Sequence, residues 1–206
     1  MHFFRNFLVK CFNIVYPCKI YGKENIPNGG AILVCNHFSA IDCAFLVDVY
    51  SKDNFFMSKK EAFDSKFLAF FLKRFGAIPI DRSGTDLKAF YATAKILKND
   101  HKLTIFAEGT RNKTGTDVLQ PLKSGSAVLS VKTKKPIVPI MILKKPKFFR
   151  RTYLMVGKPI DFSEFYGKKL SNEDIEKMDE ILRESMLAVQ TSLKDILQNK
   201  RGSKTK

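Results

Sequence analysis

The feature that most constrains the fold of this chain is the alternation of short apolar runs with longer amphipathic segments. Several runs are apolar throughout, as AILVC (31–35) and IVPIMIL (137–143) illustrate. Such runs are typical of strands that are buried on both faces, because helices cover both sides of a parallel sheet. The alternation therefore predicts an α/β fold with a central, mostly parallel sheet flanked by helices.

The expected elements are bounded by turn-forming residues such as Gly, Pro and Asn. We expect strands after Pro17 and at residues 31–35, 55–58, 77–80, 102–107, 137–143 and 152–157. We expect helices from about residue 39 and at 65–75, 84–99, 124–133 and 174–197. The 206 residues suffice for one hydrophobic core. We therefore predict a single domain at residues 21–199 and a basic disordered tail at 200–206.

The first sixteen residues, MHFFRNFLVKCFNIVY, predict an N-terminal amphipathic helix. Its apolar stripe consists of Phe4, Leu8, Cys11, Phe12 and Val15. A short, basic, Phe-rich helix suits the headgroup boundary of a bilayer, so we predict that residues 1–20 form a membrane-surface segment. A helix packed on the protein's own core is the alternative. No apolar run approaches the roughly 20 residues that a spanning helix needs, so we expect a peripheral protein.

The charge balance favours anionic partners. The chain has 36 Lys and Arg against 20 Asp and Glu, a formal net charge of +16. Residues 118–160 hold ten basic residues and no acidic one, interleaved with apolar runs and with Phe148 and Phe149. Such a surface suits an anionic bilayer, an acidic protein or a phosphorylated small molecule. The chain has no RNA-binding or helix-turn-helix pattern, so we expect no nucleic-acid partner.

The four cysteines, Cys11, Cys18, Cys35 and Cys43, form no CxxC pair and no disulfide framework. Without a secretory signal, they indicate the reducing, cytosolic side of a membrane. The group Cys35, His37, Asp42 and Cys43 has a spacing that matches no zinc pattern, so we expect no metal.

Polar residues follow three of the expected strands. They are the segment from Asn36 to Asp42, the pair Asp81 and Arg82, and the segment from Glu108 to Arg111. In an open α/β sheet, such residues gather at the carboxyl edge of the strands, where ligands bind.

His37 and Asp42 are the candidate pair for acid–base chemistry. They can meet only across a tight turn from strand to helix, with Asp42 in the first helical turn and Ser39 as the N-cap. Asp42 then accepts a hydrogen bond from one imidazole N–H, which fixes the tautomer and leaves the other nitrogen as a base. The alternatives are an Asp42 that serves the helix dipole and a His37 that is a capping or core residue.

Four blocks in order resemble those of the glycerolipid acyltransferase family, and most closely its 1-acyl-sn-glycerol-3-phosphate acyltransferases. They are NHFSAID (36–42), FGAIPIDR (75–82), FAEGTRN (106–112) and PIVPI (136–140). SKKEAF (58–63) and LKSGSA (122–127) also resemble family segments, and the likeness extends over residues 21–157. Ala107 stands where the family usually has Pro, Asn112 where Ser is common, and Pro79 interrupts an apolar run. These departures bear on substrate preference more than on activity.

The resemblance implies transfer of a fatty acyl group from an acyl thioester to the sn-2 hydroxyl of lysophosphatidic acid, giving phosphatidic acid. It implies His37 as the general base, Asp42 as the residue that orients it, and no metal or cofactor. The acyl donor would be acyl-CoA or acyl-acyl carrier protein. The expected substrate-binding residues are Asn36, Lys59, Arg82, Glu108, Gly109, Thr110 and Arg111.

Arg111 is the first candidate for the phosphate of the acceptor, because a guanidinium holds phosphate bidentately. An ion pair between Arg111 and Glu108 is the alternative. Two other functions stay open. One is the same chemistry on glycerol 3-phosphate or another lysolipid, and the other is a non-catalytic basic module that binds lipid. For the enzyme we expect a peripheral position on the cytoplasmic side of the membrane, with anionic lipids as partners.

Overall fold

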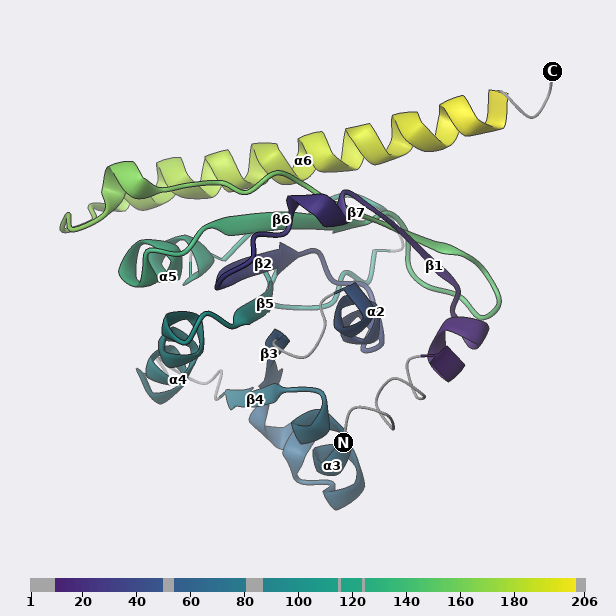
Figure 1. The fold of residues 1–206 in the computed structure, drawn as a ribbon, viewed down its shortest axis with the longest axis horizontal. Helices are drawn as coiled ribbons and strands as arrows, with labels where there is room; N and C mark the ends of the chain where they lie inside the picture. Colours follow the sequence, from purple (N-terminus) through teal and green to yellow (C-terminus); the bar gives the residue numbers. More distant parts are fainter. Residues whose placement is uncertain (1–9, 50–53, 81–86, 115, 124, 203–206) are drawn as a thin grey trace.

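The structure is a computed structural model, and it describes residues 10–49, 54–80, 87–114, 116–123 and 125–202. A seven-stranded sheet runs through the middle of these residues in the order β1-β7-β6-β2-β5-β3-β4 (Figure 1). The strands are β1 (Cys18–Tyr21), β2 (Ala31–Cys35), β3 (Asn54–Lys59), β4 (Ala77–Ile80), β5 (Lys102–Phe106), β6 (Ile137–Ile142) and β7 (Thr152–Val156). All neighbouring strands are parallel except β6 and β7. The predicted fold class is confirmed.

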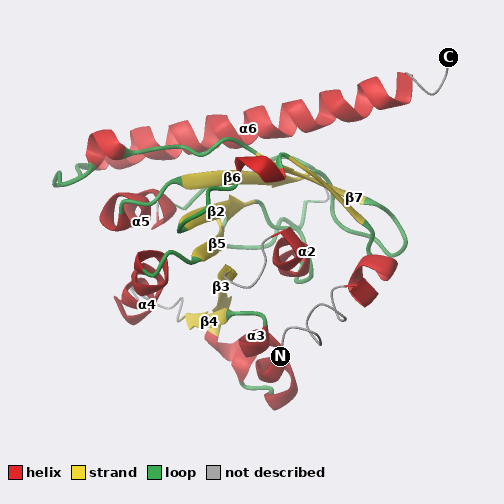
Figure 2. Ribbon diagram, in the orientation of Figure 1, coloured by secondary structure: helices red, strands yellow, loops and turns green. Residues whose placement is uncertain are grey.

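Helices cover both sides of the sheet (Figure 2). They are α2 (Asp42–Val49), α3 (Lys66–Arg74), α4 (Leu87–Lys98), α5 (Gly125–Thr133) and α6 (Asn172–Gly202). Three short 3-10 helices, which the sequence patterns do not predict, are η1 (Lys23–Asn25), η2 (Lys60–Phe63) and η3 (Ser163–Phe165).

The alternate side chains of β2 explain why this strand is apolar throughout. Ile32 and Val34 join a core that includes Leu97 of α4 and Met178 of α6. Ala31, Leu33 and Cys35 face the opposite side, where they join a core with Phe45 of α2. Because helices cover both faces, each residue of β2 is buried.

Three predicted boundaries need correction. Helix α6 continues to Gly202, so residues 200–202 of the predicted disordered tail are helical, while 203–206 lie outside the described residues. Strand β1 begins at Cys18 and pairs with β7, so the predicted domain boundary between residues 20 and 21 falls inside a strand. Helix α2 begins at Asp42 and not near residue 39.

The N-terminal segment packs, in its described part, on the protein itself. Residues 10–15 are helical, and the Phe12 ring lies 5.2 Å from that of Tyr16 and 5.1 Å from that of Phe45. Ile14 faces outward and is 72% exposed. Phe4 and Leu8 of the predicted stripe lie outside the described residues, so a membrane-surface role for residues 1–9 stays a prediction. No helix within the described residues combines the length and apolar composition needed to cross a bilayer.

Candidate active site

The polar loops that follow β2 and β5 meet at the carboxyl edge of the sheet. The two strands are parallel neighbours, with Cys35 paired to Phe106. The loops are also bonded directly: the Ala107 N–H donates to the Cys35 carbonyl at 3.1 Å, and the Asn112 N–H donates to the His37 carbonyl at 2.6 Å. The predicted meeting of these two loops is confirmed. Asp81 and Arg82, in the third predicted loop, lie outside the described residues.

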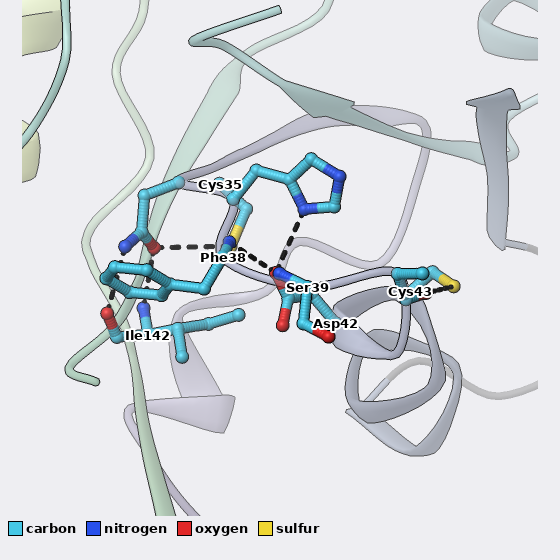
Figure 3. Close-up of polar contacts among 9 residues, drawn as sticks. Cys35, Phe38, Ser39, Asp42, Cys43 and Ile142 are labelled. Atoms are coloured by element: carbon cyan, nitrogen blue, oxygen red, sulfur yellow. Dashed lines mark hydrogen bonds and ion pairs between the residues drawn. The ribbon is translucent and has the colours of Figure 1, made fainter. Parts of the chain in front are cut away.

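The carboxylate of Asp42 organises the turn from β2 into α2. This side chain is fully buried, and its Oδ2 accepts the backbone N–H of Phe38 at 2.6 Å and of Ser39 at 2.7 Å (Figure 3). The Asp42 N–H donates in turn to the Ser39 carbonyl at 3.0 Å. The turn was expected to depend on Ser39 as an N-cap. The structure corrects this: the carboxylate of Asp42, the first helical residue, accepts the N–H groups of residues three and four positions earlier in the chain.

His37 is held by Asp42 and by an aromatic ring. Its Nδ1 lies 2.9 Å from Asp42 Oδ2, and its ring stacks on that of Phe106 with centroids 4.0 Å apart and planes 19° apart. Because Asp42 Oδ2 already accepts two N–H bonds, Nδ1 is assigned as the donor, which leaves Nε2 as the basic nitrogen. The His37 side chain is 17% exposed, so it is accessible but mostly enclosed.

Glu108 occupies the buried side of the neighbouring loop. It is 4% exposed, and its Oε1 accepts the Gln120 N–H at 3.3 Å, while its Oε2 has no partner among the described residues. Burial raises the pKa of Glu108, and the N–H groups of Gln120 and His37 lower that pKa to a smaller extent. Gly109 follows with φ 67°, a left-handed conformation that turns the chain sharply toward Thr110.

Thr110 and Arg111 are exposed, whereas Glu108 is turned inward. No ion pair joins Arg111 to Glu108, both of which the structure describes, so the alternative of an Arg111–Glu108 pair is wrong. Lys59 ends β3 at the same carboxyl edge, with β5 between β3 and β2, and its side chain is exposed.

Comparison with known proteins shows the family of this chain. Residues 17–143 match the family described as Acyltransferase. The chain belongs to the acyltransferase family. The family that the four sequence blocks predict is thereby confirmed.

This acyltransferase is 31% identical over 186 residues to the 1-acyl-sn-glycerol-3-phosphate acyltransferase of Bacillus subtilis (strain 168), covering 85% of this chain and 89% of that protein. It is 30% identical over 165 residues to the protein of that name from Streptococcus pneumoniae (strain ATCC BAA-255 / R6), covering 76% of this chain and 60% of that protein. The crystal structure of the 1-acyl-sn-glycerophosphate (LPA) acyltransferase from Thermotoga maritima has the same fold, with a TM-score of 0.66 and 22% identity. That match covers 93% of this chain and 80% of the other.

In the acyltransferase, Asn36 makes structural hydrogen bonds and not the substrate contact that was expected. It is buried, its amide nitrogen donates to the Ile142 carbonyl at 2.9 Å, and its amide oxygen accepts the Ile142 N–H at 2.8 Å. Both ends of the amide are therefore occupied by the end of β6. This geometry replaces the expected substrate contact with a structural one, in which Asn36 ties the His37 loop to β6.

The two cysteines beside the site bond to different partners. Cys35 Sγ contacts Asn36 Oδ1 at 3.7 Å, and Cys43 Sγ donates to the Ala40 carbonyl at 3.2 Å. Burial raises the pKa of the Cys35 thiol well above its usual range and that of Cys43 to about 12. A protonated thiol is a poor nucleophile and metal ligand, so neither group is prepared for such chemistry.

Sequence reasoning missed two residues that hold the acyltransferase site together. Phe106 stacks on His37, and Asn112 bonds the His37 carbonyl through its N–H and the Val118 carbonyl through its side-chain amide. Both belong to the block at 106–112, in which the sequence pattern predicts no role for either residue. The sequence signal for Phe106 is its place near the end of the strand predicted at 102–107, directly before the Glu108 loop.

Proposed function

We propose that this acyltransferase moves a fatty acyl group from an acyl thioester to the sn-2 hydroxyl of lysophosphatidic acid and so forms phosphatidic acid. The observation that carries the proposal is the His37–Asp42 pair, bonded at 2.9 Å at the edge of the sheet beside the loop from Glu108 to Arg111. The printed names of the bacterial relatives, which specify 1-acyl-sn-glycerol-3-phosphate as acceptor, support the choice of acceptor.

In the proposed reaction, His37 Nε2 takes the proton of the acceptor hydroxyl as its oxygen attacks the thioester carbonyl. The C–S bond then breaks, and the departing thiolate receives the proton from Nε2. Asp42 keeps the Nδ1 proton in place and stabilises the imidazolium that forms between the two steps. An acyl-enzyme is not needed, because the hydroxyl itself is the nucleophile.

Positive side chains near this edge would hold the phosphate of the acceptor. Arg111 is the first of them, because its guanidinium is exposed and follows the Gly109 turn directly. Lys59 is a further candidate for phosphate binding, and Arg82, outside the described residues, is one on the sequence pattern alone. Glu108, with its carboxylate turned inward, would shape the loop that presents Thr110 and Arg111.

The proposed place of action is the cytoplasmic side of a membrane, where the enzyme is peripheral. The net charge of +16 supports this, since an anionic bilayer surface attracts basic proteins. Either acyl-CoA or acyl-acyl carrier protein suits the basic surface as a donor, and both are included in the test below.

The test is acyl transfer by the purified protein from labelled oleoyl and palmitoyl thioesters of coenzyme A and of acyl carrier protein. Lysophosphatidic acid and glycerol 3-phosphate are offered in parallel, with His37→Ala as the control. We expect phosphatidic acid from the lysolipid alone, and none from the variant. Product from glycerol 3-phosphate alone would overturn the assigned acceptor, and full activity of His37→Ala would overturn the assigned base.

A further inference from the structure

The loop between β6 and β7 carries a dense combination of exposed cations and exposed aromatic rings. Its sequence from residue 144 to 151 is KKPKFFRR, and every cation in it is exposed. Phe148 is 67% exposed and Phe149 is 75% exposed. Adjacent Phe side chains that remain in solvent are uncommon in a folded domain, and exposed apolar groups of this kind mark interaction sites.

We propose that this loop is the element that docks the enzyme on an anionic lipid bilayer. The two rings would enter the boundary between headgroups and acyl chains, while the flanking Lys and Arg side chains would contact lipid phosphates. The inference rests on the proposed membrane location and specifies which surface makes the contact. It assigns docking to a loop outside the N-terminal segment 1–20.

The loop is held in place by the N-terminal helical residues. The Phe149 N–H donates to the Val15 carbonyl at 2.8 Å, and the Phe148 ring lies 4.8 Å from that of Tyr16. Ile14, the neighbour of Val15 in the sequence, is a further exposed apolar residue of this segment. The docking surface is therefore supported by packing and is not a free hairpin tip.

The backbone of Phe149 is a second independent sign. Its φ is 53°, in the left-handed region that bulky residues rarely adopt. A glycine or asparagine would satisfy this conformation with less strain, and a polar side chain would suit the solvent better than a benzyl group. A role for the exposed ring outside the protein explains both features together.

The position of the loop relates docking to catalysis. Strands β6 and β2 are parallel, so the loop leaves the sheet at the edge where the His37 turn begins. Asn36 joins the two directly through its bonds to Ile142, the last residue of β6. Figure 1 places this loop beside the N-terminal helical residues, on the same side of the molecule as α2. Docking through the loop would turn the active-site edge toward the lipids that carry the acceptor.

An acidic carrier protein would also be attracted by five cations, but charge alone does not require two adjacent rings in solvent. A bilayer interface accounts for the cations and for the apolar tip together, so the lipid surface is the occupant that we propose. The carrier protein becomes an outcome of the test.

The test is co-sedimentation of the full chain with vesicles of phosphatidylcholine, or of phosphatidylcholine mixed with phosphatidylglycerol. One variant combines Phe148→Ser with Phe149→Gly, and a second combines Lys144→Gln, Lys145→Gln and Lys147→Gln. We expect each variant to bind the mixed vesicles more than about tenfold more weakly than wild type. Binding equal to wild type in both variants would overturn the proposal.

Helix α4 supplies a matched control. It carries the exposed Tyr91, Lys95 and Lys98, and its end leads into β5 at the edge of the sheet opposite the active site. Tyr91→Ser combined with Lys95→Gln and Lys98→Gln removes one exposed aromatic ring and two positive charges. We expect this control to bind vesicles like wild type, and a loss of binding equal to that of the loop variants would overturn the assignment of docking to the loop.

Folding and chemistry are monitored separately. Phe149→Gly relieves the left-handed strain, so we expect its thermal midpoint to equal or exceed that of wild type while vesicle binding falls. With a short-chain lysolipid dissolved below its micellar concentration, we expect the loop variants to turn over like wild type. Absence of turnover by wild type itself would instead contradict the proposed function. Retained vesicle binding with a raised KM for acyl-acyl carrier protein would assign the loop to that protein and overturn docking on lipid.

Discussion

The ring of Phe106 lies flat against the imidazole of His37, with centroids 4.0 Å apart. The contact depends on the pairing of two strands, because Phe106 ends β5 opposite Cys35 at the end of β2. Asp42 fixes the imidazole through Nδ1, and Phe106 fixes its plane. Nδ1 is thereby occupied, and among the residues that the structure describes no hydrogen bond engages Nε2.

Phe106→Leu should slow the enzyme without unfolding it. Leucine fills much of the space but cannot stack, so the imidazole gains freedom to rotate. An aromatic pair contributes about 0.5–1.5 kcal/mol, which corresponds to a fall in kcat of about 2- to 12-fold. Steady-state kinetics with the acceptor and donor that the wild type uses would measure this, and Phe106→Tyr should keep most of the activity. An unchanged kcat in Phe106→Leu would show that Asp42 alone is sufficient to position His37.

Asp42→Asn should lower kcat by about 10²- to 10⁴-fold, because an amide cannot stabilise the imidazolium. Its oxygen can still accept the N–H groups of Phe38 and Ser39, so we expect the thermal midpoint to stay near that of wild type. Thermal unfolding and turnover are measured on the same preparation. A loss of activity smaller than about tenfold would contradict the role of Asp42.

Asn36→Asp should destabilise the protein by about 3 kcal/mol at neutral pH. The change is isosteric, but it removes the N–H that the Ile142 carbonyl accepts and places a carboxylate in a buried site. Urea unfolding would measure the free energy, and the loss should shrink at acidic pH, where the carboxyl is protonated. Asn172→Asp at the exposed start of α6 is the control and should change stability by less than about 0.5 kcal/mol.

Glu108 should make stability fall as pH rises above the ordinary glutamate value. Burial raises its pKa above 4.5, so the folded protein holds this proton more tightly than the unfolded chain does. Its contribution is therefore most favourable below 4.5 and declines as pH rises through the raised pKa.

The comparison of wild type with Glu108→Gln isolates this group, since the variant cannot titrate. The free energy of unfolding of wild type, minus that of the variant, should become less favourable between about pH 4 and about pH 8. Urea unfolding across this range measures the difference. A difference that stays flat with pH would mean that Glu108 is ionised in the folded protein as readily as in the unfolded chain.

Arg111→Ala should raise the KM for lysophosphatidic acid by more than about tenfold if its guanidinium holds the phosphate. Arg111→Lys keeps the charge but loses the bidentate geometry, so it should restore only part of the affinity. The KM for the acyl donor serves as the internal control and should change little. Equal increases in both KM values would point to a general disturbance of the loop.

The elements that could be predicted from the sequence are those whose residue types directly indicate which of their faces are buried. Each residue of 31–35 is apolar because β2 is covered on both faces, and this is visible without knowing what covers it. The five described long helices were likewise predicted, although their ends shifted by up to a few residues. The His37–Asp42 contact was also accessible, because a spacing of five residues permits it only at a turn.

The features that were missed depend on partners that are distant in the sequence. The stacking of Phe106 requires the order of β2 and β5 in the sheet, and the bonds of Asn36 require the end of β6. Asp42 stabilises the turn because its carboxylate accepts N–H groups of residues that precede it in the chain. The usual N-cap pattern does not describe this arrangement, since there the side chain accepts N–H groups of residues that follow it. β7 is antiparallel to β6 because the connection between them is too short for a crossover, and the alternation of apolar runs does not by itself indicate this.

Strand β1 occupies the edge of the sheet, and β7 is its partner there. A shortened protein that began after residue 21 would therefore expose the unpaired backbone of β7, and such an edge invites intermolecular pairing and aggregation. Insoluble protein from that deletion could be mistaken for a membrane-targeting defect. Deletions that test the first residues should stop before Phe12, whose ring packs on α2, so that the sheet keeps its outer strand.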